Sequence, residues 1–257
     1  MRKKDIFMLV LKQVLKDIKK NQLYKKDDLR AIYNDLKQAY FYYNFKKFNF
    51  FSYGNLKLNK NIMIFNLPST ITCPCSCVKC YAKKAERIYK NTRYMRLKNY
   101  FIMLLCNHDY IFRKIVKNIF IQKINSHALL YKKPILRVHE SGDFFNKKYL
   151  NFWLSIKKDK FLNKKIKFYS YSKKLDFKTI LNIKEKYNFN IVSSFIDIKG
   201  KKYINYGNFE YIEKLKALLK ENNMPFFTCD YGVKNTLHCG INCMACCNYS
   251  IVLFYVH

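Results

Sequence analysis

Two cysteine clusters that share one spacing constrain this chain more than any other feature of its sequence. Residues 73–80 read CPCSCVKC, residues 239–247 read CGINCMACC, and both contain C-x3-C-x2-C. Thiols spaced this closely along a chain are poor disulfide partners for one another, but they are good ligands for a soft metal centre. We therefore predict a metalloprotein. The candidate ligands are Cys73, Cys77 and Cys80 in the first cluster and Cys229, Cys239, Cys243 and Cys246 in the second.

The first cluster favours an iron–sulfur centre. Three thiolates on one loop hold three irons of a [4Fe–4S] cube and leave the fourth iron open to a substrate or cofactor. Cys75 offers a fourth thiol, so zinc is the alternative metal. Four ligands within one short loop are awkward for tetrahedral zinc, because zinc sites usually draw two ligands from each of two separated segments.

The second cluster fits an auxiliary iron–sulfur cluster and a structural zinc site about equally well. Cys229 precedes the shared spacing and would complete a set of four thiolates. Cys247, His238 and His257 are further candidate ligands. A third arrangement, which the sequence also leaves open, is a single metal site that both cysteine clusters share.

The net charge is +33, from 50 Lys and Arg against 17 Asp and Glu. A charge of this size attracts polyanions, so nucleic acid is a possible partner for the basic surface, with salt-sensitive and unspecific binding. The basic residues are mostly Lys, in a chain also rich in Asn, Ile, Tyr and Phe. Because an AT-rich coding sequence produces this composition, coding bias is the favoured explanation of the charge.

The cysteine usage also indicates the compartment. Clustered rather than evenly spread cysteines suit a metal protein of the reducing cytoplasm better than a secreted disulfide framework. The N-terminal segment 1–20 has basic residues and a short apolar run that Lys12 interrupts, so we expect an amphipathic helix and not a signal peptide. No apolar stretch approaches the ~20 residues of a membrane span, and we expect no membrane partner.

The hydrophobic pattern alternates between strands and helices, which predicts an α/β fold with a mostly parallel sheet or a partial barrel. We expect an N-terminal helical pair and hairpin over 1–59, an α/β core over 60–224 and a Cys-rich segment over 225–257. The predicted strands are 62–67, 134–139, 166–171, 190–196 and a short one at 225–228. The predicted helices are 5–19, 26–42, 80–90, 93–106, 109–125, 147–158, 175–187 and 208–222.

Polar residues cluster where the predicted strands end, which is where ligands bind in such folds. His139, Glu140 and Asp143 follow one strand and are candidates for acid–base work or for holding a cofactor. An N-cap of the next helix is the structural alternative for Asp143. The candidate pocket hydroxyls, whose alternative role is to fill the interior, are those of Ser170, Ser172 and Ser193.

The blocks FNLPSTITCP and CYAKKAE within 65–86, RVHESGDFF at 137–145, KFYSYSKK at 167–174 and the C-terminal cysteines resemble the phage "gene product 88" domain family. The resemblance covers the chain from about residue 60 onward. It implies a phage or mobile-element origin and a shared cysteine architecture, and it supplies no reaction.

A more distant resemblance is to radical S-adenosylmethionine enzymes, which carry C-x3-C-x2-C after the first strand of a βα series. It implies a catalytic [4Fe–4S] cluster, S-adenosylmethionine, an external reductant and an unknown substrate. Lys79 and the SGD turn at 141–143 depart from that pattern, where an aromatic residue and Gly-Gly-Glu-Pro are usual. The alternative function is a zinc-stabilised, nucleic-acid-binding protein of a mobile element.

Overall fold

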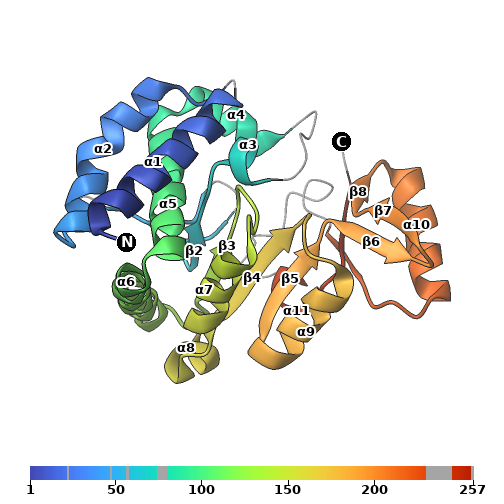
Figure 1. Ribbon diagram of the computed structural model, residues 1–257. Helices are drawn as coiled ribbons and strands as arrows, with labels where there is room; N and C mark the ends of the chain where they lie inside the picture. The colour runs from blue at the N-terminus through green and yellow to red at the C-terminus, as the bar shows by residue number, and fades with distance from the viewer. Residues whose placement is uncertain (22, 47, 56–57, 74–79, 230–244, 256–257) are drawn as a thin grey trace. The chain divides into compact units, whose positions relative to one another are not determined.

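The computed structural model describes residues 1–257 except 22, 47, 56–57, 74–79, 230–244 and 256–257 (Figure 1). The chain divides into two compact units, each assembled from alternating segments of sequence. Unit 1 comprises residues 1–52, 65–124 and 139–156, and unit 2 comprises residues 53–64, 125–138 and 157–257. The three consecutive segments expected from the sequence stay a prediction.

A five-stranded sheet in the order β1-β2-β3-β4-β5 forms the centre of the α/β fold. Neighbours β3 and β4 pair in parallel, as do β4 and β5. Their apolar side chains are buried, which is typical of parallel strands covered on both faces. The mixed fold with a mostly parallel sheet is therefore confirmed. The strands are β1 Phe51–Tyr53, β2 Ile62–Phe65, β3 Ile135–Val138, β4 Lys167–Ser172 and β5 Phe189–Ser193.

Unit 1 is mainly helical, and its N-terminal helices pack against α5. The predicted stripe of α1 is buried at Ile6, Val10, Val14 and Ile18, while Leu9 is exposed. The ring of Phe7 packs against several aromatic rings of the same unit. The helices that begin in unit 1 are α1 Lys3–Lys19, α2 Lys26–Phe41, α3 Ser69–Thr72, α4 Tyr81–Ile88, α5 Lys90–His108, α6 Tyr110–Leu130 and α7 Lys147–Lys157.

Unit 2 adds two small sheets that sequence periodicity did not predict. One has the order β8-β10-β9 with both pairs parallel, and the other is the antiparallel pair β6-β7. Helix α10 packs an apolar face against β6 and the β10 segment (Figure 1). The remaining elements are α8 Lys160–Lys165, α9 Phe177–Tyr187, β6 Phe195–Ile198, β7 Lys201–Ile204, β8 Tyr206–Gly207, α10 Phe209–Glu221, β9 Phe227–Cys229, α11 Ala245–Asn248 and β10 Val252–Tyr255.

No helix among the described residues is both long enough and apolar enough to span a bilayer.

Candidate functional site

The first cysteine loop joins the end of α3 to the start of α4 in unit 1. Cys73 directly follows α3, Cys80 directly precedes α4, and both are half-buried. Cys75 and Cys77 lie outside the described residues. The two described thiols therefore mark the ends of the loop on which the metal was predicted.

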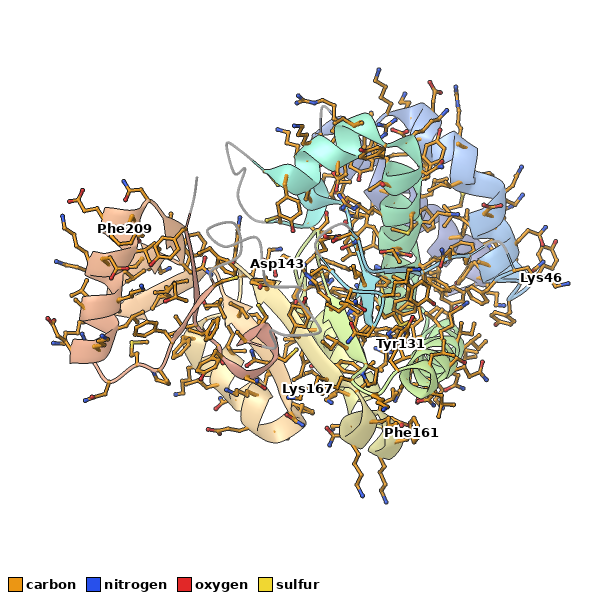
Figure 2. All side chains as sticks on the ribbon, turned by 180° about the vertical axis from the view of Figure 1, so that it is seen from behind. Lys46, Tyr131, Asp143, Phe161, Lys167 and Phe209 are labelled. Atoms are coloured by element: carbon orange, nitrogen blue, oxygen red, sulfur yellow. The ribbon has the colours of Figure 1, made fainter. Side chains whose placement is uncertain are left out.

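Both ends of this loop are attached to the turn that follows β3. At one end, the backbone N–H of Asp143 donates to Thr72 Oγ1 over 3.3 Å, one residue before Cys73. At the other end, the hydroxyl of Tyr81 donates to the carbonyl of Glu140. The residues that flank the cysteine loop therefore contact the turn at 140–143 within unit 1, where Figure 2 labels Asp143.

Asn66 fixes the start of that turn against the segment leaving β2. Its Oδ1 accepts from the backbone N–H groups of Glu140, at 2.9 Å, and Ser141, at 2.8 Å. The backbone N–H of Leu67 donates to the carbonyl of Ser141, and Asn99 Nδ2 donates to the carbonyl of Asn66. A buried side chain that satisfies two amides in this way costs free energy to displace.

A fully buried carboxylate joins α3, α4 and the turn after β3. Glu86 accepts from the backbone N–H of Ser69 at 2.8 Å, from the Ser69 hydroxyl at 3.0 Å and from the Ser141 hydroxyl at 3.1 Å. Arg96 Nη1 pairs with Glu86 Oε1 at 2.7 Å, and both side chains are almost completely buried. The same carboxylate raises the pKa of Tyr24, whose burial is the larger cause. This network was not predicted, because its members are ordinary polar residues far apart in sequence.

Gly142 is the position in the turn that tolerates no side chain. Its φ is +90°, a conformation that L side chains rarely adopt. An added Cβ would lie 2.7 Å from both Leu67 Cβ and Thr72 Oγ1. The glycine therefore permits the close approach of the turn to the residue before Cys73.

The three predicted acid–base candidates differ in their surroundings. His139 is buried at φ +71°, with Nε2 2.7 Å from the Tyr149 hydroxyl and its ring edge-on to Phe144, so its contacts are those of a core residue. Asp143 is buried, and its Oδ1 accepts from the N–H of Phe144. Glu140 is the half-buried member of the three.

The N-cap alternative for Asp143 is wrong. Helix α7 begins at Lys147, and Asn146 Oδ1 accepts from the N–H of Tyr149 in the first turn. That bond is the N-cap bond expected of an Asn placed directly before a helix. Asp143 shapes the turn before this cap.

The predicted serine hydroxyls lie in unit 2, on β4 and β5. Ser172 Oγ accepts from the N–H groups of Lys174 and Leu175, and Ser193 Oγ donates to the carbonyl of Phe195. Ser170 is completely buried, with Oγ 3.3 Å from the carbonyl of Tyr171. These hydrogen bonds to backbone groups stabilise the local chain, and the part of the three hydroxyls in a ligand pocket stays a prediction.

The second cysteine cluster is surrounded by aromatic and apolar side chains of unit 2. Cys246 Sγ lies 2.7 Å from the Tyr171 hydroxyl. Burial raises the pKa of Tyr171 well above its ordinary value, and the charge of Cys246 is a smaller cause of the same shift, so the hydroxyl keeps its proton. Cys229 and Cys246 belong to one apolar cluster with Val192 and Val252.

Helix α11, which carries Cys246 and Cys247, is held on the sheet by Asn190. Its Nδ2 donates to the carbonyl of Cys246 at 2.8 Å and to the carbonyl of Tyr249 at 2.7 Å. On the same face of the sheet, the guanidinium of Arg137 lies over the ring of Tyr171, at 5.2 Å. Cys239 and Cys243 lie outside the described residues.

Among the residues that the structure describes, no three His, Cys, Asp or Glu side chains gather into a group that could hold a metal. Three of the seven predicted ligands, Cys77, Cys239 and Cys243, are outside that part of the chain. The donor chemistry of the remaining four fits a thiolate-ligated centre, with two cysteines at the ends of one loop and two in one cluster.

The model of the Gene product 88 family matches residues 37–244. The chain therefore belongs to the Gene product 88 family, which the sequence blocks around the first cysteine loop and the SGD turn had indicated. Comparison with the curated proteins and with the solved structures gave no match. The comparisons gave no support to the resemblance to radical S-adenosylmethionine enzymes.

Proposed function

We propose that the protein binds an iron–sulfur cluster through Cys73, Cys77 and Cys80. The attachment of both loop ends to one turn, through Thr72 and Tyr81, is the observation that carries the proposal. Anchored ends reduce the conformational entropy lost when three thiolates converge on one centre. The buried network of Glu86 beneath the loop adds rigidity where a ligand set requires it.

The finer proposal is that this cluster serves S-adenosylmethionine chemistry. When bound, a [4Fe–4S] cluster with one open iron supplies one-electron reduction of a sulfonium ligand. The chain's own contribution would be Glu140, whose half-buried carboxylate would accept from a ligand amino group. Asp143 fixes the turn through its contact with the N–H of Phe144.

Anaerobic purification followed by metal analysis tests the main proposal. We expect brown protein with broad absorption near ~400 nm and with iron and acid-labile sulfide in equal amounts. Cys77→Ser should remove the iron assigned to the first cluster. Cys106→Ser is the matched control, because Cys106 is buried within α5 and should leave the iron content unchanged. Equal iron in Cys77→Ser and wild type would overturn the assignment.

The test for the finer proposal is separate. Reduced protein should cleave S-adenosylmethionine to methionine and 5′-deoxyadenosine, and Glu140→Gln should weaken binding of S-adenosylmethionine without loss of iron. Iron-loaded protein that does not bind S-adenosylmethionine would reject this step and leave the cluster proposal standing.

The alternative is zinc, and the second cysteine cluster favours it. Cys229 and Cys246 lie in an apolar environment, as structural zinc ligands commonly do, and Cys239 and Cys243 would complete four thiolates. Colourless protein with stoichiometric zinc would support this function, with the basic surface then serving nucleic-acid binding. Iron in the first cluster and zinc in the second is also distinguishable, because Cys246→Ser would then remove zinc alone.

A further inference from the structure

A pocket of about 450 Å³ lies in unit 1 on the side where α2 begins and α4 meets α5. None of the predicted site residues lines it. Its walls come from the segment before α2, the first turn of α2, the end of α4 and the first turn of α5. The lining residues are Leu23, Lys25, Asp27, Asp28, Arg87, Lys90, Arg93 and Tyr94.

The charges of this pocket do not cancel. Asp28 is paired with Arg93, at 3.2 Å, and Asp27 is paired with Arg30, at 3.1 Å. Lys25, Arg87 and Lys90 do not take part in the ion pairs found among the described residues. Three cations therefore face the pocket without a paired carboxylate, which is the electrostatic signature of an anion site.

The floor of the pocket is rigid. Arg93 Nε donates to Asp28 Oδ1, and Arg93 Nη1 donates to the carbonyl of Glu86 at 2.8 Å. The other carboxylate oxygen of Asp28 accepts from the backbone N–H of Lys25 at 2.9 Å. These bonds join α2, α4 and α5, so the three unpaired cations project from elements fixed to one another.

Two further features specify the anion. Lys90 begins α5, a helix of 19 residues, so the N–H groups and the positive end of the helix dipole add to the attraction for a phosphate. Tyr94 supplies an aromatic wall with Lys90 Nζ 5.4 Å from the centre of its ring. The pocket is much larger than one phosphate ion, and a flat ring beside cations suits a nucleobase with its phosphate.

We propose that this pocket binds the phosphate and base of a nucleotide, either free or within a single-stranded nucleic acid. Lys25, Arg87 and Lys90 contact the phosphate, and Tyr94 stacks on the base. This site is separate from the proposed cluster, and neither proposal requires the other.

The test measures binding of a fluorescein-labelled 12-nucleotide oligo-dT by anisotropy and of a fluorescent ATP analogue by titration. Arg87→Ala with Lys90→Ala removes two exposed cations from the pocket. Lys12→Ala with Lys16→Ala is the matched control, because it removes two exposed cations from α1 of the same unit. Thermal unfolding followed by circular dichroism checks that both double variants fold alike.

We expect the pocket variant to bind at least about tenfold more weakly than the control, since it loses two charge-assisted contacts to the phosphate. With oligo-dT, the slope of log K against log salt should fall by about 1.4, the value for two lost phosphate contacts on a single strand. Tyr94→Leu should weaken binding further than Tyr94→Phe, which keeps the ring.

The two ligands distinguish the source of the nucleotide. An effect on the ATP analogue alone indicates a free nucleotide, and an effect on both with tighter oligo-dT binding indicates a single strand. Equal weakening by the pocket and control variants would mean attraction by net charge alone and would overturn the proposal. Absence of binding of both ligands to the wild-type protein would also overturn it.

Discussion

The two units surround their buried and half-buried cations in different ways. In unit 1, Arg96 and Arg93 contact the carboxylates of Glu86 and Asp28. In unit 2, Arg137 lies over the rings of Tyr171 and Tyr169, and the buried Lys157 lies 4.7 Å from the centre of the Phe168 ring. Lys157 Nζ donates to the carbonyls of Asn163 and Ile166.

The two cysteine clusters share one spacing, but the described cysteines of each lie in different surroundings. Cys73 and Cys80 adjoin helices α3 and α4, which a hydrogen-bonded network of ions and hydroxyls joins through directional contacts. The second cluster lies among rings, where packing dominates and one hydroxyl points at a thiol. We infer that the first environment suits chemistry at an exposed face of a cluster, and the second suits a centre that stabilises the fold.

The largest effect should come from breaking the carboxylate network of unit 1. Glu86→Ala leaves Arg96 buried without its partner, and we expect the free energy of unfolding to fall by about 3–5 kcal/mol. Glu210→Ala is the control, because the pair of Glu210 with Lys214 is about three-quarters exposed and should contribute less than about 0.5 kcal/mol. Urea unfolding measures both, and a loss below 1 kcal/mol for Glu86→Ala would contradict the assigned role.

The next test concerns the turn above that network. Gly142→Ala places a Cβ against Leu67 and Thr72, and we expect a loss of about 2–4 kcal/mol from the clash and the positive φ together. Gly200→Ala is a matched control, because Gly200 has φ +80° and no atom within 4 Å of its added Cβ. The difference between the two variants isolates the clash, and equal losses would show that the turn has room to move.

The pH dependence of the free energy of unfolding tests the surroundings of Lys157 in unit 2. Burial lowers the pKa of Lys157 to about 8, below the ordinary value of about 10.4. The unfolded chain therefore binds more protons in this interval, so the free energy of unfolding should rise with pH from about 8 to about 10, by an amount on the order of 1–3 kcal/mol. Denaturant unfolding between pH 7.5 and 9.5 measures the slope.

Two variants show whether this slope belongs to Lys157. Lys157→Met should abolish the rise, since it replaces the titrating group with an apolar chain of similar length. Lys158→Met changes an exposed neighbour, and we expect it to leave the rise unchanged. A slope that is the same in all three proteins would assign the pH dependence to other groups.

The smallest expected effect is at the second cysteine cluster. Tyr171→Phe removes the hydroxyl that contacts Cys246 and should cost about 0.5–1.5 kcal/mol in metal-free protein. Tyr169→Phe is the control on the same strand face. In metal-loaded protein, a shift of the thiolate-to-metal absorption in Tyr171→Phe alone would identify Cys246 as a ligand, and identical spectra would argue against it.

The fold was largely predictable from the sequence. The strands β2, β3 and β4 lie within one or two residues of the expected runs, because buried parallel strands are short apolar segments with clear boundaries, while β5 ends three residues before the expected position. In the small sheets of unit 2, β9 overlaps the short strand expected at 225–228, and β8 and β10 were missed. Strand β8 has two residues, and β10 follows the cysteines, so neither carries enough length for a periodic signal.

The candidate site was predictable only in part. The spacing of the cysteines and the SGD turn are local patterns, and the contact of Asp143 with Thr72 joins the turn to the residue before Cys73. The roles of Glu86 and Asn66 were not predictable, since their partners lie up to 75 residues away in the chain and are fixed only by tertiary packing. The acid–base role expected of His139 stays a prediction, and its ring packs against Phe144 and Tyr149.

Glu86 contributes both to the hydrogen-bonded network around Ser69 and Ser141 and to the pocket that Arg93 lines. Its carboxylate holds Ser69 and Ser141 below the cysteine loop, while its backbone carbonyl accepts from Arg93 on the floor of the nucleotide pocket. A nucleotide in this pocket would therefore lie beside Arg93, whose bond to Glu86 joins the pocket wall to the network around Ser69 and Ser141. Linkage is reciprocal, so loading the loop with metal would change nucleotide affinity by the same factor as nucleotide changes metal affinity. If both proposed ligands bind, any coupling between them through this contact would pass through Glu86.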